Sequence, residues 1–386
     1  TTYNGTAVIL SVGNLTGTFT SRVFDAGASA RWDNLTETSG EPSVEILFSV
    51  DGQSDVWKSA NSGVNWSLLK DDYNGADNNG ATYMDKNSSG SLFILFNQDV
   101  WTSVDNGVSW TKVNDDYNEA EGQNAYVFVV DNNNALIVIE GDQDVWKSIN
   151  SGVTWSKVSD DFNGGNGNIF GIAVNSSNVI FVVDNQADVW KSTNSGVNWS
   201  LLKDDYNGAI GNHATYMAVN SSDSLFILDA QDVWKSVDNG VSWTLANDDF
   251  NGAGDSNDGW VMYIDTNNFI YVIDGSEDVY KSTDSGATFS KIASDFNGAN
   301  GNIFGLTSAT SASSLSFQVR NCSSADCSDA SFVNANLTNL NLTGRYFQYK
   351  VGFTSPDISI SPSLKNATIN YELINSAPTI SIVSPQ

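Results

Sequence analysis

A segment of 44 to 46 residues recurs six times along this chain of 386 residues. Each copy opens on Asp-Val-Trp, or on Asp-Val-Tyr in the last copy, and the six motifs begin at Asp55, Asp99, Asp144, Asp188, Asp232 and Asp278. Between motifs, short β-branched and aromatic runs alternate with Gly, Asn and Asp, as strands alternate with turns. Four such runs fit in each copy, and a four-stranded sheet every 40 to 50 residues or so is typical of a β-propeller.

Counting strands also predicts how the ring closes. A single strand, within 44–50, precedes the first motif, whereas two strands precede each later motif. The missing innermost strand is expected after the sixth copy, because NIFGLTSAT (302–310) matches NIFGIAVNS (168–176). We therefore predict an all-β fold with a six-bladed propeller, whose first blade is closed by one late strand and three early strands.

One half of the ring is a near copy of the other half. Residues 55–76 and 188–209 differ at a single position, and ATYMDKNSSGSLFILF (81–96) matches ATYMAVNSSDSLFIL (214–228). We interpret the chain as a duplicated three-blade unit. A half-ring would leave sheet edges exposed at its two ends, and the second unit covers them by completing the ring.

Each motif is followed by a box of the form Ser-x-Asn/Asp-x-Gly-x-x-Trp/Phe. The third-position side chain can accept hydrogen bonds from turn backbone, the Gly tolerates positive φ, and the aromatic residue anchors the turn in the core. The third-position residues are Asn61, Asp105, Asn150, Asn194, Asp238 and Asp284. Six boxes in register resemble the Asp-box, or BNR, repeat of sialidase-like β-propellers, which implies the propeller architecture.

The segments outside the repeats alternate apolar and polar residues as strands do. They are 17–36 before the ring, and 314–322, 344–355 and 362–373 after it. A Ser-Arg-x-x-Asp-x-Gly stretch in the first piece and Phe-Gln-Val-Arg in the second resemble the lectin-like β-sandwich domains of prokaryotic surface proteins. We predict a discontinuous β-sandwich formed by 1–40 and 311–375, with the propeller, 41–310, inserted between them. Residues 376–386 are expected to be a linker or a strand that leads to a further domain or a neighbouring subunit.

The ring lacks the residues of sialidase catalysis. The resemblance implies an arginine triad that binds the substrate carboxylate, but 41–310 contains no arginine. The single histidine, His213, gives no credible catalytic triad, and the acids of the ring recur from blade to blade as structural residues do. We predict that the chain is not an enzyme. A glycoside hydrolase that uses two carboxylates is the remote alternative.

The formal net charge is −28, and such a surface repels phosphate backbones, so nucleic acid is not an expected partner. Acidic side chains in Gly-rich turns provide oxygen ligands for calcium, which is the one cofactor that the sequence suggests. The longest acidic loop is 248–259, and its candidate ligands are Asp248, Asp249, Asp255 and Asp258. The alternative is that these residues only shape the turns.

Several features favour an extracellular or cell-surface protein. Cys322 and Cys327 are expected to form a disulfide, with a two-thiolate metal site as the alternative. The candidate glycosylation sites are Asn4, Asn14, Asn34, Asn87, Asn175, Asn220, Asn336, Asn341 and Asn366. No run reaches the roughly 18 apolar residues of a membrane-spanning helix.

The preferred function is a non-enzymatic structural subunit of a cell-surface layer, filament or appendage. Its partners are expected to be further copies of itself or other surface proteins, joined by strand addition through 6–12 and 378–384. The alternative is a carbohydrate- or protein-binding adhesin. Trp260 is the candidate for glycan stacking, whereas the aromatic residue of each Asp-Val-Trp/Tyr motif is expected in the core.

Overall fold

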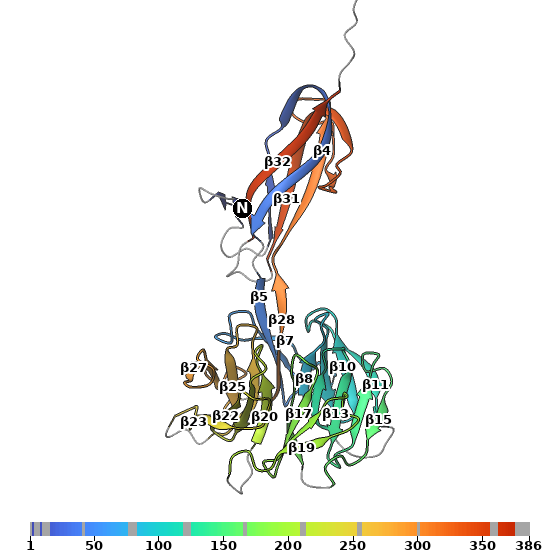
Figure 1. Cartoon of the computed structure of the whole chain (residues 1–386). Coiled ribbons are helices and arrows are strands. Elements are labelled where there is room, and N and C mark those ends of the chain that lie inside the picture. Colours follow the sequence, from blue (N-terminus) through green and yellow to red (C-terminus); the bar gives the residue numbers. More distant parts are fainter. Residues whose placement is uncertain are drawn as a thin grey trace, which may run out of the picture. The chain divides into compact units, whose positions relative to one another are not determined.

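The computed structural model describes residues 2–3, 8–9, 16–40, 43–75, 83–118, 125–164, 168–208, 214–252, 257–298, 302–355 and 362–374. These residues form β-strands joined by turns, and no helix among them is long and apolar enough to cross a membrane. The chain divides into two compact units, Glu45–Thr310 and the pair of segments Thr1–Val44 and Ser311–Gln386 (Figure 1).

The unit of Glu45–Thr310 is the predicted six-bladed β-propeller. Blade one contains, in spatial order, β28 (Ile303–Ala312), β5 (Ser43–Asp51), β6 (Val56–Ser59) and β7 (Ser67–Lys70). One late strand therefore completes a sheet of three early strands, and the predicted closure is confirmed.

The other five blades follow one another along the chain as four-stranded antiparallel sheets. Their strands are β8 (Tyr83–Lys86), β9 (Leu92–Phe96), β10 (Asp99–Ser103), β11 (Thr111–Asp115); β12 (Ala125–Val130), β13 (Leu136–Glu140), β14 (Val145–Ser148), β15 (Ser156–Ser159); β16 (Ile169–Val174), β17 (Ile180–Asp184), β18 (Val189–Ser192), β19 (Ser200–Lys203); β20 (Ala214–Val219), β21 (Leu225–Asp229), β22 (Asp232–Ser236), β23 (Thr244–Asn247); and β24 (Gly259–Ile264), β25 (Ile270–Asp274), β26 (Val279–Ser282), β27 (Ser290–Ala293).

The second strand of a blade is its most buried part. In β13, β17, β21 and β25 all five residues are buried. Neighbouring blades cover both faces of these strands, so apolar residues follow one another without polar alternation. This packing explains why the second strand of each repeat is a continuous apolar run in the sequence.

An aromatic cluster fills each junction between blades. The ring of Tyr73, which follows the outer strand of blade one, has its centroid 5.7 Å from that of Trp101 and 5.7 Å from that of Trp110 in blade two. The same clusters are Tyr117 with Trp146 and Trp155, Phe162 with Trp190 and Trp199, Tyr206 with Trp234 and Trp243, Phe250 with Tyr280 and Phe289, and Phe296 with Trp57 and Trp66. The last cluster joins the sixth blade to the first. The Trp/Tyr series therefore packs between blades rather than forming open sugar platforms.

The boxes form identical turns. In each of the six, the third-position Oδ1 accepts a hydrogen bond of 2.9 Å from the backbone N–H four residues later. The box glycine adopts a positive φ, for example 87° at Gly152, where another residue would be strained. These contacts show why Asn and Asp exchange freely at the third position, since both offer the same acceptor oxygen.

The second unit is an eight-stranded sheet. Its strands are β1 (Thr2–Tyr3), β2 (Val8–Ile9), β3 (Thr16–Thr20), β4 (Phe24–Gly40), β29 (Ser314–Cys322), β30 (Val333–Asn334), β31 (Leu342–Thr354) and β32 (Ser363–Leu373). The order is β1-β2-β32-β4-β31-β29-β30, and β3 pairs with β31. Trp32, Phe347 and Phe353 are buried in its core. Hydrogen bonds join these strands into one sheet, so the two-sheet sandwich predicted from the sequence is not shown.

Candidate functional site

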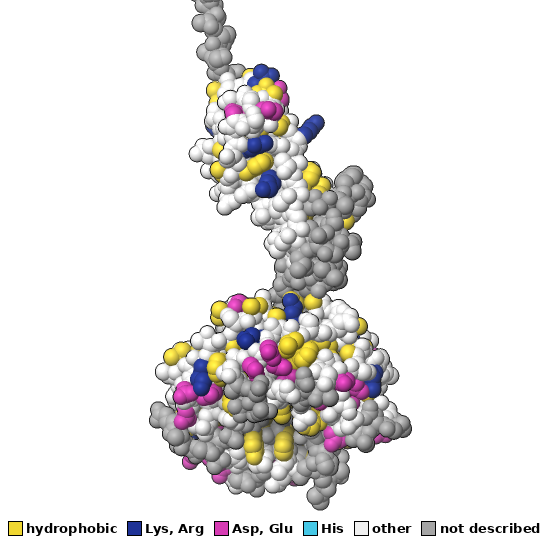
Figure 2. Space-filling model, turned by 180° about the vertical axis from the view of Figure 1, so that it is seen from behind, with side chains coloured by type: hydrophobic (Ala, Val, Ile, Leu, Met, Phe, Trp, Pro, Cys, Tyr) yellow, Lys and Arg dark blue, Asp and Glu magenta, His cyan; other side chains and the backbone are white. Residues whose placement is uncertain are grey.

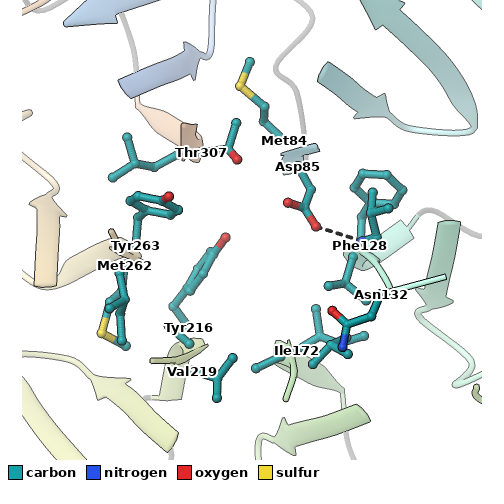
Figure 3. Close-up of a pocket in the computed structure, with 17 residues that line it drawn as sticks. Met84, Asp85, Phe128, Asn132, Ile172, Tyr216, Val219, Met262, Tyr263 and Thr307 are labelled. Atoms are coloured by element: carbon teal, nitrogen blue, oxygen red, sulfur yellow. Dashed lines mark hydrogen bonds between the residues drawn. The ribbon is translucent and has the colours of Figure 1, made fainter. Parts of the chain in front are cut away.

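The innermost strands of all six blades surround a cavity of about 210 Å³ (Figure 3). Its wall comes from β8, β12, β16, β20, β24 and β28, which makes it the axial cavity of the propeller. Most of the residues that line it are apolar, such as Ile172, Val219 and Met262, although polar atoms form the larger part of its exposed surface. Asp85 is the only acidic residue among the described residues that line it.

The Asp85 carboxylate is held by two backbone groups. Its Oδ2 accepts a hydrogen bond of 2.7 Å from the Val130 N–H, and its Oδ1 accepts one of 2.8 Å from the Lys86 N–H. Burial raises the pKa of this carboxyl to about 6, although both N–H groups and the charge of Lys86 favour the ionised form. At neutral pH the cavity therefore carries a negative charge.

Two tyrosines from opposite blades meet near Asp85. The rings of Tyr83 and Tyr216 stack with their centroids 5.7 Å apart, and the Tyr83 hydroxyl donates to the carbonyl of Phe170 at 2.9 Å. No hydrogen-bond partner of the Tyr216 hydroxyl is found among the described residues, and its ring points into the cavity (Figure 3). Burial, with Tyr83 and Asp85 nearby, holds the pKa of Tyr216 well above its usual value, so its hydroxyl stays protonated.

A polar cluster lies beside the cavity where blades six, one and two meet. The Tyr263 hydroxyl donates to Glu45 Oε1 at 2.8 Å, and Lys86 Nζ lies 2.9 Å from Ser308 Oγ. Burial opposes ionisation of Glu45, but hydrogen bonds from Ser308, Tyr263 and Thr266 hold its pKa below the usual value. Burial lowers the pKa of Lys86 despite the nearby charges of Glu45 and Asp85.

The sequence analysis did not single out Asp85, Lys86 or Glu45. A usable pattern was present in the duplicated segments, because Asp85 and Lys86 stand where the matching half has Ala218 and Val219. Residues that differ between two otherwise matching copies are not required by the blade fold. Such differences point to a role specific to one half.

The repeated aspartates shape loops. Five of the six motif aspartates accept, through Oδ1, the backbone N–H of the residue 17 positions later: Asp55 from Asp72, Asp144 from Asp161, Asp188 from Asp205, Asp232 from Asp249 and Asp278 from Asp295. The sixth, Asp99, forms an ion pair of 2.8 Å with Lys112. On the face seen in Figure 2, acidic side chains of the propeller form several separate groups.

The predicted calcium ligands are not brought together in the part of the chain that the structure describes. Asp248 is exposed, Asp249 Oδ1 accepts the Gly252 N–H at 2.8 Å, and the carbonyl of Asp258 accepts the Gly275 N–H. Asp255 lies outside the described residues, so the calcium prediction is untested. The described acids that do converge are Glu140, Asp142 and Asp144. Glu140 is already bonded to the Trp146 indole N–H and Asp144 to Lys157.

The remaining predicted residues have varied surroundings. Cys322 and Cys327 form a disulfide, and both are buried. Trp260 packs edge-on against Phe304, with ring centroids 6.0 Å apart. Among the sequons, Asn175 is only 5% exposed and its Oδ1 fixes a turn, whereas Asn336, Asn341 and Asn366 are exposed. Asn4, Asn14 and His213 lie outside the described residues.

No protein-family model matches the sequence, and no curated protein matches it. Solved structures do resemble the fold. YCF48 bound to D1 peptide is 11% identical, with a TM-score of 0.43, and the match covers 74% of this chain and 86% of that one. Virginiamycin B lyase from Staphylococcus aureus is 10% identical, with a TM-score of 0.46, covering 82% and 99%. The GH74 xyloglucanase from Xanthomonas campestris is 15% identical, with a TM-score of 0.45, covering 70% and 46%. The similarity of the chain to these structures concerns the fold alone.

Proposed function

We propose that this chain is a non-enzymatic extracellular structural protein, a subunit of a cell-surface layer, filament or appendage. The observation that carries the proposal is a sheet edge that the described strands leave partly unpaired. On one side, β32 pairs with β4 along its length, from Ser363 to Leu373. On the other side, β2 pairs only with Ser363 and Leu364. From 365 to 373, no strand among the described residues covers that side.

An open edge is a template for another strand. The exposed fractions of Leu373 and Ile374 are 53% and 48%, so apolar side chains are exposed at the end of this edge. We propose that a terminal segment of a neighbouring copy adds to the sheet here, as in other cases of β-strand addition. We also infer that the propeller belongs with the Asp-box propellers and that the flanking unit is of the lectin-like surface type.

The positions of the carboxylates support a non-enzymatic function. Glycosidases use two carboxyl groups that flank one bond. Of the described residues that line the axial cavity, Asp85 alone is acidic, and the repeated aspartates hold turns. The propeller segment 41–310 also contains no arginine for binding an acidic sugar.

Negative-stain electron microscopy of the full chain tests the assembly, with and without a calcium chelator. Regular filaments or sheets are expected, and their loss on chelation would assign calcium to the acidic loops. The double variant Leu373→Lys/Ile374→Lys should abolish them, because charges at an edge oppose strand addition. Val104→Lys is the matched control, since Val104 is an exposed apolar residue of the propeller. Single particles of the unmodified chain under both conditions would refute the proposal.

A second candidate, a glycan-binding adhesin, is favoured by a set of aromatic residues. The second residue of the inner strand is Tyr126, Phe170, Trp260 and Phe304 in four blades. The exposed fractions of Tyr126 and Phe170 are 36% and 38%. Stacking on such rings is a common way to hold sugars or aromatic groups. A glycan-binding screen tests this candidate, and a hit that survives Trp260→Ala together with Phe170→Ala would exclude this site.

A further inference from the structure

We propose that the axial cavity binds a small organic ammonium ion, with the Asp85 carboxylate as its counter-ion and the rings of Tyr216 and Tyr263 as part of its wall. This binding is separate from assembly through the sheet edge, and neither depends on the other.

The bonding of Asp85 leaves it able to take a ligand. Each carboxylate oxygen accepts one backbone N–H and keeps acceptor capacity. No lysine or arginine among the described residues forms an ion pair with Asp85. Its neighbour Lys86 instead directs its ammonium group to Ser308, 2.9 Å away, and does not line the cavity. The charge of Lys86 favours the ionised form of Asp85 but makes no contact with the carboxylate, so a cationic ligand in the cavity would stabilise it further.

The rest of the wall selects an organic cation rather than a bare metal ion. Calcium takes six to eight oxygen ligands, roughly, whereas this wall is mostly Val, Ile, Leu, Met and Ala. The aromatic rings of Tyr216 and Tyr263 suit an ammonium group through cation–π attraction. The Tyr216 hydroxyl, which has no partner among the described residues, can also accept one N–H of the ligand. An apolar body next to the ammonium group would then contact Ile172 and Met262.

The size and ends of the cavity limit the ligand. Its volume of about 210 Å³ equals that of roughly seven liquid water molecules, which fits a molecule of a few carbon atoms. The stacked Tyr83 and Tyr216 lie toward the end where the inner strands begin. Asn132, an exposed residue just after β12, lies at the other end. At that end an exposed residue forms part of the wall, and the inner strand β28 of blade one continues into β29 of the other unit.

The duplication argues that Asp85 is not there for the fold. Blade five has Ala218 at the matching position, and its inner strand has the same register with its second strand as that of blade two. The blade therefore folds with alanine at this place. The carboxylate is present in blade two, is absent from the matching position of blade five, and faces a cavity. Binding of a ligand explains it better than packing does.

Isothermal titration calorimetry of the full chain with n-butylammonium chloride at pH 7.5 tests the proposal, with n-butanol as the uncharged probe of similar shape. We expect saturable binding of n-butylammonium and none of n-butanol. Asp85→Asn and Asp85→Ala should each weaken binding at least tenfold, because a charge-assisted hydrogen bond is lost. Asp71→Asn, which removes an exposed charge elsewhere on the propeller, should leave binding unchanged.

Asp85→Ala installs the residue that blade five already carries, so it should fold, and its thermal unfolding is measured alongside. No saturable binding to the unmodified chain would overturn the proposal. So would equal affinity of the Asp85 variants, equal binding of n-butanol, or displacement of n-butylammonium by millimolar calcium chloride at constant ionic strength.

Discussion

Replacing Asp85 by Asn should make the ligand-free protein more stable at pH 8. The Asp85 carboxyl titrates with a pKa of about 6 in the folded chain, against an ordinary value of 3.8, because burial disfavours its charged form. Between these two values the folded protein holds a proton that the unfolded chain has released. Stability therefore falls as pH rises from about 4 to about 6, and the loss persists at higher pH.

The size of the effect follows from the pKa difference. Each pKa unit corresponds to about 1.4 kcal/mol, so a shift from 3.8 to about 6 costs up to about 3 kcal/mol of unfolding free energy. Asn carries no charge and keeps one oxygen that can accept the Val130 N–H, but its amide nitrogen cannot accept the Lys86 N–H, which costs about 1 kcal/mol at every pH. We expect removal of the charge to contribute up to about 3 kcal/mol of stability to Asp85→Asn at pH 8 and nothing below pH 4.

Urea unfolding followed by tryptophan fluorescence measures this difference at pH 8, 6 and 4. Comparing variant with parent at each pH removes the contributions of all other acids. Asp248→Asn is the control, because it deletes an equal charge at an exposed position and should show a small, flat difference. A variant that is equally destabilised at pH 8 and pH 4 would refute the reasoning and give Asp85 a structural role.

Three further predictions concern the fold. Asn150→Ala should lower the free energy of unfolding by about 1 kcal/mol, because the 2.9 Å hydrogen bond from the Thr154 N–H is lost. Asn150→Asp should be nearly neutral, since Asp238 occupies the same place in another box. Equal losses for the two variants in urea unfolding would contradict this. Phe296→Ala and Phe162→Ala should each lower the free energy of unfolding by about 2–4 kcal/mol, because each phenyl group packs on two tryptophans at one blade junction. A negligible loss for Phe296→Ala alone would mean that its cluster does not hold the propeller closed. Cys322→Ser with Cys327→Ser should destabilise the eight-stranded sheet by about 2 kcal/mol and leave the calorimetric transition of the propeller unchanged; a shifted propeller transition would show that the two units unfold together.

The sequence by itself determined the propeller. The box residues Asn150 and Gly152 act within a few residues of chain, through a side-chain acceptor and a positive φ, so six copies of the pattern specify six identical turns. The strand count specified closure as well, because the late strand Ile303–Ala312 repeats the pattern of an inner strand. Local chemistry repeated in register is readable without knowledge of distant contacts.

In the flanking unit, the sequence pattern predicts the strands but not how they pair. Alternating apolar and polar residues predict a strand with one buried face, but they do not say which strands share hydrogen bonds. The long strands Phe24–Gly40 and Leu342–Thr354 pair with several neighbours and join all the described strands of the unit into one sheet. Alternation therefore predicts the strands of this unit, but not the pairing order that the structure shows.

Only the tertiary structure decided the candidate site. Asp85 and Tyr216 belong to opposite blades, and ring closure alone brings them to one axial cavity. The difference between Asp85 and Ala218 is visible in the sequence, but its meaning depends on which side chains point to the axis. Burial at that axis is what shifts the Asp85 pKa, and burial is a property of six assembled blades rather than of any one repeat.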